Sequence, residues 1–232
     1  MIYRSGVRYD QTGVKPDFCL ESMAQSKVTV YSIRTDTVRE WDLSRLEQRM
    51  PERMRKANRF RFEKDRLLCL GAGILLHETL GISSEGLIRY GINGKPFAPG
   101  YPAFNLSHSG QWCLLAADGI CRQIGVDVEE ISERNIDIAP AVYTRSELVG
   151  MESDPVNRFY RLWTWKESLM KASGLGMQME PQSFEVLPFA EGRSVYAAGQ
   201  AWYAWAGGMD GYAYSICADQ PVHGAIWKEI RL

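Results

Sequence analysis

The feature that most constrains this chain is a short acidic segment near its middle, residues 124–129. Its aliphatic residues alternate with Gly125, Asp127 and Glu129, which is the period of a half-buried strand. Successive side chains of a strand point to opposite faces, so both carboxylates share one face and the aliphatic side chains share the other. The segment therefore predicts a strand that buries one face and presents an acidic one.

A second charged segment, farther along the chain, has the period of a helix. Trp163, Glu167 and Lys171 recur at every fourth position and therefore lie along one stripe. If this stripe faces Asp127 and Glu129, carboxylates and an ammonium group meet at a strand–helix junction. Mg²⁺ prefers a few carboxylates together with water and phosphate oxygens, so such a group suits a Mg²⁺-assisted reaction on a phosphate ester. The alternative is that Asp127 and Glu129 occupy the solvated face of an edge strand.

Polar residues outside the acidic segments add candidate phosphate ligands. Ser107 and His108 are followed by Gly110, which allows a tight turn. Adjacent residues point in different directions and the sequence has no G-x-S-x-G elbow, so a Ser/His nucleophile is not favoured. Donation to phosphate oxygens is the better use of both side chains, and Lys95 adds a fixed positive charge.

The distribution of charge excludes some functions and leaves others open. A net charge of −1 over 232 residues gives no global electrostatic argument for nucleic-acid binding. Positive charge is concentrated in residues 45–66, which form either a solvated helical face or a landing surface for an anionic ligand or acidic partner. Lys166 lies on a different side of its helix from Lys171 and is interpreted as a surface charge.

Cysteine spacing and hydropathy indicate the compartment. The five cysteines form no close pair and no metal-type spacing, which suits buried free thiols in a reducing compartment. Residues 1–27 hold no apolar stretch long enough for a signal peptide, and no window approaches a membrane span. We therefore expect a cytoplasmic protein that does not insert into a membrane.

The chain divides into an extension and two similar halves. We expect an N-terminal extension over residues 1–27, an N-terminal half over 28–122, and a C-terminal half over 123–232 that carries the metal site. Residues 110–118 resemble residues 211–219, which suggests an internal repeat. The expected fold is α+β, with two pseudo-symmetric halves, the active site at their seam, and a monomeric state because the seam is already internal.

The remaining patterns predict elements of both kinds. Alternation predicts strands over residues 28–33, 104–107, 111–117, 184–187, 195–205 and 211–218, and turn residues predict an irregular hairpin over 87–96. Composition and end signals predict helices over 42–60 (divided by Pro51, with Ser44 a possible N-cap), 63–80, 139–151 and 155–173.

Together and in this order, the motifs resemble those of the 4′-phosphopantetheinyl transferases, specifically the larger two-halved group that activates peptide and polyketide synthetases. The matching segments are residues 94–96, 104–110, 124–129 and 163–171, and the resemblance covers roughly residues 28–219. It implies transfer of the phosphopantetheine arm from coenzyme A to a serine of an acyl or peptidyl carrier protein, with release of adenosine 3′,5′-bisphosphate.

The resemblance also implies a metal site. Asp127, Glu129 and Glu167 would hold Mg²⁺ against the coenzyme A pyrophosphate, and Lys171 would steady the phosphate or the leaving group. Because a carrier protein is expected to be acidic, residues 45–66 would either steer it or bind the 3′-phosphate of coenzyme A.

Further residues gain roles from the same resemblance. Lys95, Ser107 and His108 would bind coenzyme A phosphates. Either Glu167 or Glu147 would act as the base for the carrier serine, and the sequence does not decide between them.

Two other functions would use the same residues. A metal-dependent phosphohydrolase would use the carboxylates to activate water and would need no acceptor protein. A non-catalytic module that binds coenzyme A or a carrier would keep all its activity without Asp127.

The first long helix departs from the family's D-x-x-R pattern, because Asp65 is followed directly by Arg66.

Overall fold

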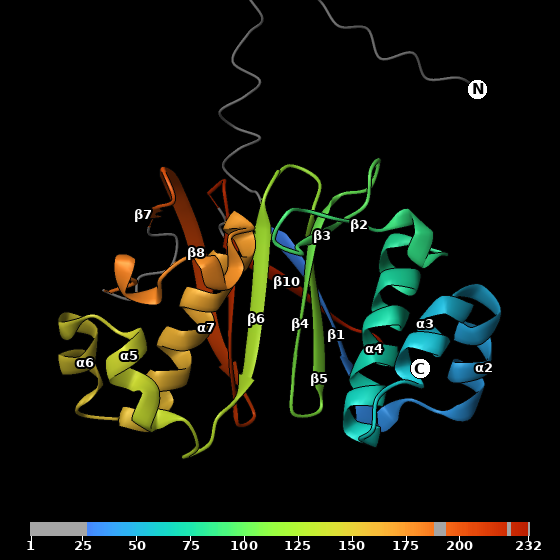
Figure 1. Cartoon of the computed structure of the whole chain (residues 1–232), viewed down its shortest axis with the longest axis horizontal. Helices are drawn as coiled ribbons and strands as arrows, with labels where there is room; N and C mark the ends of the chain where they lie inside the picture. Colours follow the sequence, from blue (N-terminus) through green and yellow to red (C-terminus); the bar gives the residue numbers. More distant parts are fainter. Residues whose placement is uncertain (1–26, 188–193, 222–223, 232) are drawn as a thin grey trace, which may run out of the picture.

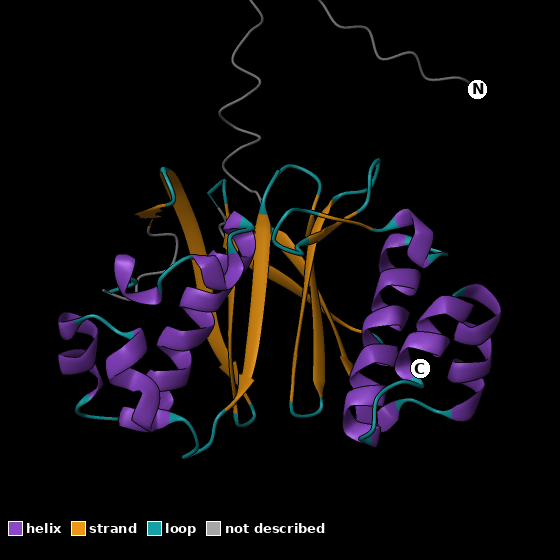
Figure 2. Cartoon of the chain, in the orientation of Figure 1, coloured by secondary structure: helices purple, strands orange, loops and turns teal. Residues whose placement is uncertain are grey.

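The described residues form two four-stranded sheets that stand side by side, with helices on the outer flank of each (Figures 1 and 2). The computed structural model describes residues 27–187, 194–221 and 224–231. The expected extension over residues 1–27 therefore lies, apart from Lys27, outside the described residues. No helix within the described ranges is long and apolar enough to cross a membrane.

The strand order is β10-β1-β5-β4 in the first sheet and β6-β9-β8-β7 in the second. The first sheet comprises β10 (Ala225–Glu229), β1 (Val28–Arg34), β5 (Trp112–Asp118) and β4 (Ala103–Ser109). The second comprises β6 (Ile124–Glu130), β9 (Tyr212–Ala218), β8 (Gln200–Met209) and β7 (Ser194–Ala197), and a small hairpin is formed by β2 (Arg89–Tyr90) and β3 (Pro96–Phe97). The helices are α2 (Glu40–Arg49), α3 (Pro51–Ala57), α4 (Glu63–Leu80), α5 (Ala139–Val142), α6 (Arg145–Met151) and α7 (Pro155–Ser173). Short 3₁₀ turns cover Thr35–Thr37, Glu85–Leu87, Ile136–Ile138, Gly176–Gln178 and Pro181–Ser183.

Both halves repeat one topology. In the first half β1 is followed by the long helix α4 and the hairpin β4–β5, and in the second β6 is followed by α7 and the hairpin β8–β9. In each half the first strand pairs antiparallel with the last strand of the hairpin. The two hairpin turns contain Gly110 and Gly211, both at positive φ, which glycine adopts without strain. The expected α+β fold with two similar halves is therefore confirmed.

One strand crosses between the halves. The sequence did not predict β10, which follows the whole second sheet along the chain. It pairs in parallel with β1, with Val28 opposite Ala225 and Ser32 opposite Glu229. The end of the chain is thereby attached to the first sheet.

Helix boundaries follow local chemistry. Both long helices end at glycines in the left-handed conformation, Gly81 with φ 71° and Gly174 with φ 74°. Pro51 begins α3 at its first position, as expected from its fixed φ and missing N–H. The N-cap predicted at Ser44 is wrong, because α2 already begins at Glu40.

Several expected elements of the C-terminal half differ in the structure. The helix expected over residues 139–151 is split, because Thr144 begins α6 with a capping box: its hydroxyl accepts the Glu147 N–H, and the Glu147 carboxylate accepts the Thr144 N–H. No strand forms over residues 184–187. The strand expected over 195–205 is instead the hairpin β7–β8.

A shared apolar core joins the halves. Val126 and Val128 of β6 are fully buried in one cluster with Val28 and Val30 of β1 and with Leu114 of β5. Burying one such side chain contributes roughly 1.5–3 kcal/mol. This cluster holds the aliphatic face of β6 against the first sheet, so that its acidic face is left for α7.

The cysteines of the described part are buried free thiols, as expected. They are Cys69, Cys113, Cys121 and Cys217. Burial raises the pKa of both Cys113 and Cys121 to about 12, so these thiols are unreactive near neutral pH. Cys19 lies outside the described residues.

Candidate active site at the seam

Strand β6 lies directly beside helix α7 (Figure 1). The face that meets the helix is the one that holds Gly125. Gly125 makes this approach possible, because a Cβ at that position would collide with the carbonyl oxygen of Ser168 and the amide nitrogen of Ala172. The next residues on the same face of the strand are Asp127 and Glu129. The close packing therefore brings the charged stripe of α7 onto these carboxylates.

Asp127 and Lys171 form an ion pair, and together with Glu129 and Glu167 they make up what we call the acidic group. The Lys171 Nζ lies 2.6 Å from the Asp127 Oδ1. Ser107 of β4 joins them, donating to the same Asp127 oxygen at 2.9 Å and accepting from Lys171 at 3.0 Å. Asp127 is only 1% exposed, and within the described residues its Oδ2 has no hydrogen-bond partner. A buried acceptor without a partner is costly, so this oxygen is a candidate ligand for a cation.

The electrostatics of the pair are set by burial and by the surrounding acids. Burial raises the pKa of Asp127, and the ion pair with Lys171 offsets that effect only in part. Burial would lower the pKa of Lys171, but the attraction of Asp127, Glu167 and Glu129 outweighs it, so the pKa is raised. Lys171 is therefore held as an ammonium among more carboxylates than it can neutralise.

Glu129 and Glu167 complete the acidic group. Burial and then repulsion from Asp127 raise the pKa of Glu129 to about 7, although its bond with the Ser109 hydroxyl acts in the opposite direction. Burial and the same repulsion raise the pKa of Glu167. Carboxylates that raise one another's pKa lie within electrostatic reach, and a divalent cation would reverse the shift.

The two remaining basic candidates have different surroundings. His108 is exposed on β4, but desolvation by the protein around it and repulsion from Lys171 lower its pKa. Lys95 donates to the carbonyl of Ile124 at 2.9 Å and to that of Ala172 at 2.7 Å. Burial lowers the pKa of Lys95 to about 8. Lys95 thus ties the β2–β3 loop to the start of β6 and the end of α7.

Glu147 is not brought into this group. It forms a fully buried ion pair with Lys166 on another side of α7, with Oε2 and Nζ 3.0 Å apart. Its carboxylate also accepts the backbone N–H groups of Thr144 and Val186, and the Lys166 ammonium donates to two backbone carbonyls. The interpretation of Lys166 as a surface charge is wrong, because α6 supplies a buried carboxylate that matches it.

The basic stretch over residues 45–66 is partly internal. Arg53 is 6% exposed and forms an ion pair with Glu85, and Arg66 pairs with Glu63. The landing-surface interpretation therefore does not apply to Arg53. The exposed basic side chains of the stretch are Arg45, Arg49, Arg55, Lys56, Arg59, Arg61 and Lys64.

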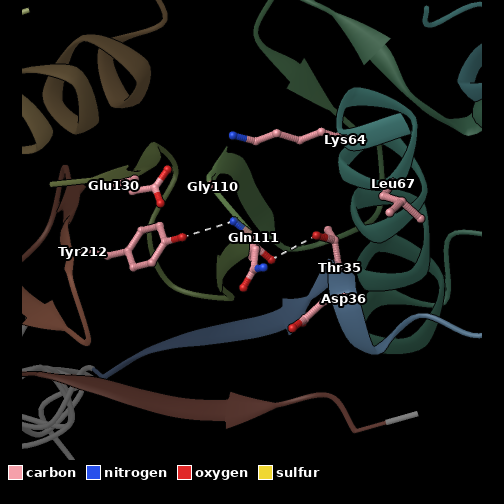
Figure 3. A pocket seen from close by; sticks show the side chains of 8 residues that line it. All are labelled: Thr35, Asp36, Lys64, Leu67, Gly110, Gln111, Glu130 and Tyr212. Atoms are coloured by element: carbon pink, nitrogen blue, oxygen red, sulfur yellow. Dashed lines mark hydrogen bonds between the residues drawn. The ribbon is translucent and has the colours of Figure 1, made fainter. Parts of the chain in front are cut away.

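Among the described residues, cavities open along the seam toward both ends of β4. The larger, of about 570 Å³, is lined by Gly110 at the β4–β5 turn and by Lys64, Glu130 and Tyr212 around it (Figure 3). The Tyr212 hydroxyl accepts the N–H of Gln111, which ties the halves together at this cavity. The smaller, of about 230 Å³, lies between the β2–β3 loop and the end of α7 and is lined by Lys95, Asn105 and Lys171 among others. The acidic group lies between the two.

A row of polar side chains on β4 joins the two sheets. Three side chains accept backbone N–H groups of β6: Asn105 from Val126 at 3.0 Å, Ser107 from Val128 at 3.3 Å, and Ser109 from Glu130 at 3.1 Å. The two edge strands therefore run in the same direction and are bridged by side chains at these positions. Sequence reasoning assigned no role to Asn105 or Ser109, although polar residues at every second position of a strand are a readable signal.

The acidic group fits Mg²⁺ by its chemistry. Among the described residues, no three His, Cys, Asp or Glu side chains gather closely enough to enclose a metal ion. Mg²⁺, however, is usually held by one or two carboxylates plus water and substrate phosphates. The buried Oδ2 of Asp127 and the raised pKa of Glu129 both match such a partly open site.

Comparison with known proteins points to one family. Residues 123–217 match the model of the 4′-phosphopantetheinyl transferase superfamily. A 4′-phosphopantetheinyl transferase of Bacillus subtilis is 33% identical over 147 residues, covering 58% of this chain and 64% of that protein. The match therefore spans less than two thirds of that relative's length.

Two further relatives carry the same description. The 4′-phosphopantetheinyl transferase Sfp of Bacillus subtilis strain 168 is 28% identical over 186 residues, covering 74% of this chain and 82% of that protein. The 4′-phosphopantetheinyl transferase ffp of Bacillus subtilis is 32% identical over 153 residues, covering 61% and 67%. The region matched by the family model contains Asp127, Glu129, Glu167 and Lys171.

Proposed function

Because this chain belongs to the 4′-phosphopantetheinyl transferase superfamily, we propose that it transfers the 4′-phosphopantetheine arm of coenzyme A to a serine of an apo acyl or peptidyl carrier protein. The observation that carries the proposal is the Asp127–Lys171 pair, which lies at the seam. One buried oxygen of this carboxylate has no hydrogen-bond partner among the residues that the structure describes. The serine oxygen would bond to the phosphorus that carries pantetheine, and the pyrophosphate bond between that phosphorus and the bridging oxygen would break. The bridging oxygen would leave with adenosine 3′,5′-bisphosphate.

Asp127, Glu129 and Glu167 are the proposed Mg²⁺ ligands. The ion would supply neutralisation of the pyrophosphate and would hold it in line for attack. Phosphoryl transfer otherwise asks the protein mainly for positioning and fixed charge. An acidic group whose pKa values are raised by mutual repulsion is suited to receive such an ion.

The basic residues are assigned to the phosphates. Lys171 has the raised pKa of a permanent ammonium and lines the smaller cavity, so it would stabilise the charge of the leaving phosphate. His108 is exposed on β4 and would donate to a phosphate oxygen. Ser107 and Lys95 are proposed to contact coenzyme A phosphates as well. The Ser107 hydroxyl donates to Asp127, and the Lys95 ammonium donates to two backbone carbonyls.

Glu167 is the proposed base for the carrier serine. Its carboxylate belongs to the acidic group at the seam, within electrostatic reach of Asp127 and Lys171, where the pyrophosphate is proposed to bind. Glu147, the other candidate, has a fully buried carboxylate bonded to Lys166 and to backbone N–H groups. We therefore place the proton transfer at Glu167.

We also propose that the protein acts as a cytoplasmic monomer.

The intact mass of an apo carrier protein, incubated with this protein and coenzyme A, tests the proposal. Parallel reactions contain Mg²⁺, EDTA, or Mg²⁺ with the Asp127→Ala variant. We expect a gain of one phosphopantetheine mass only with Mg²⁺ and Asp127 present. Consumption of coenzyme A without any acceptor would instead indicate a phosphohydrolase, and binding without turnover across several carriers would indicate a non-catalytic module.

A further inference from the structure

Ser107 and Ser109 make the same pair of hydrogen bonds, one step apart along the seam. The Ser109 hydroxyl donates to the Glu129 Oε2 at 2.9 Å and accepts the N–H of the following residue of β6 at 3.1 Å. The Ser107 hydroxyl donates to the Asp127 Oδ1 at 2.9 Å and accepts the N–H of the following residue at 3.3 Å. Each serine thus connects one carboxylate to the backbone that carries it.

The repeat follows from strand geometry. A hydroxyl has one proton and two lone pairs, so it can accept a backbone N–H and donate to a carboxylate at once. Side chains on one face of a strand recur at every second residue, so serines spaced by two match acids spaced by two. Asn105, two residues before Ser107, accepts the N–H of Val126 in the same way. At this step the residue of β6 that corresponds to Asp127 or Glu129 is Gly125, which has no carboxylate.

Glu129 needs such a restraint. It lies within electrostatic reach of Asp127 and Glu167, and burial, followed by repulsion from these two acids, raises its pKa. A glutamate side chain has several rotatable bonds, and fixing them costs conformational entropy unless a contact holds the carboxylate. The Ser109 hydroxyl holds this carboxylate by donating to its Oε2. Ser107, by contrast, also contacts Lys171, so its effects cannot be separated from those of the ion pair.

We propose that Ser109 is a positioning residue that fixes the Glu129 carboxylate for the bound cation. The N-terminal half thereby takes part in shaping a metal site whose ligands all belong to the C-terminal half. The proposal rests on the proposed function only for the identity of Glu129 as a metal ligand. Partners of metal-binding carboxylates typically change metal affinity or activity by about 10–100-fold when they are removed.

The test measures metal binding without turnover. Mn²⁺ alone is titrated into the full-length protein, free Mn²⁺ is followed by electron paramagnetic resonance, and the thermal midpoint of each variant is recorded. We expect Ser109→Ala to weaken Mn²⁺ binding by about tenfold. Ser109→Thr keeps the hydroxyl and should restore most of the affinity.

Asn105→Ala is the matched control. It also removes an acceptor for a β6 N–H group at the seam, so we expect its thermal midpoint to fall at least as far as that of Ser109→Ala, while its Mn²⁺ affinity stays within twofold of the parent. Equal Mn²⁺ affinity of Ser109→Ala and the parent would overturn the proposal, as would an equal loss in Asn105→Ala or a parent that binds no Mn²⁺. Carrier modification is measured on the same samples to test the proposed function separately. If the parent transfers phosphopantetheine, the proposed function stands, whatever the Mn²⁺ affinities of the variants.

Discussion

Helix α7 carries two lysine–carboxylate pairs on different faces, and they have opposite surroundings. The pair of Lys166 and Glu147 is fully buried, and backbone groups complete the hydrogen bonds of both side chains. The pair of Lys171 and Asp127 faces the seam, with the Lys171 side chain 28% exposed and the Asp127 Oδ2 unpartnered within the described residues.

We propose that this difference separates a structural pair from a functional one. We call the Lys166–Glu147 pair the closed pair. It has no net charge, and groups inside the protein satisfy its hydrogen bonds, so a ligand would gain nothing there. We call the Lys171–Asp127 pair the open pair. Glu167 and Glu129 lie within electrostatic reach of it, so the group as a whole lacks positive charge. Buried charge is tolerated where it is fully paired, and a group left incomplete points to a ligand. Lysines five positions apart on one helix thus have unrelated roles.

Asp127→Asn should have the largest effect, and it should fall on activity. We expect the rate of carrier modification to drop by about 10³-fold, because a metal ligand and the counter-ion of Lys171 are lost together. The free energy of unfolding should fall less than in Glu147→Gln, because the Lys171 side chain is 28% exposed and keeps the attraction of Glu167 and Glu129. Intact-mass kinetics and urea titration measure the two quantities. An active variant would show that the open pair is not the site.

Glu147→Gln should show the reverse pattern. We expect it to lower the free energy of unfolding by about 3 kcal/mol or more, because Lys166 would be left buried without its counter-ion. Activity per folded molecule should be unchanged. Urea titration and the initial rate of transfer measure these effects. The double variant Glu147→Gln with Lys166→Met should regain part of the lost stability. A loss of turnover at unchanged stability would contradict this comparison and assign the base to Glu147.

Periodicity was sufficient to predict the open pair. Alternation along residues 124–129 and the four-residue spacing of Glu167 and Lys171 are local properties, and they fix which side chains share a face. Once β6 and α7 pack together at Gly125, those faces meet. The half of the site that comes from these two elements could therefore be predicted from the sequence.

The closed pair could not be predicted in this way. Periodicity places Lys166 on another side of α7, but it does not say what that side contacts. The burial of Lys166 depends on Glu147, whose position depends on the capping box that splits the expected helix over 139–151. The strand β10 was missed for a related reason, because its pairing partner β1 lies at the other end of the chain. Both depend on tertiary contacts.

Gly125→Ala should disturb the open pair and spare the closed one. The added Cβ would meet the backbone of Ser168 and Ala172, neither of which can move without shifting α7. Overpacking of this kind costs about 1–3 kcal/mol, and the shift should also misplace Glu167 and Lys171 and lower the transfer rate at least tenfold. Urea titration and initial rates test this. Gly211→Ala serves as a control, since a Cβ there has space, and it should cost only the strain of its positive φ.

The smallest effect concerns pH and the open group alone. The pKa of Glu129 is about 7 in the folded protein, above its ordinary value of 4.5, so the folded state binds this proton more tightly than the unfolded state. Between these two pKa values the folded state therefore loses stability as pH rises, by an amount on the order of 1 kcal/mol after allowance for solvent screening.

Urea unfolding in EDTA at a series of pH values measures this effect, with Glu129→Gln as the reference. The difference in unfolding free energy, parent minus variant, should fall as pH rises from about 4.5 to 7. Asp127 and Glu167 also have raised pKa values, so only that difference isolates Glu129. Parallel curves for the parent and Glu129→Gln would mean that Glu129 titrates as an ordinary surface acid, and the distinction between the open and closed pairs would then rest on Asp127 alone.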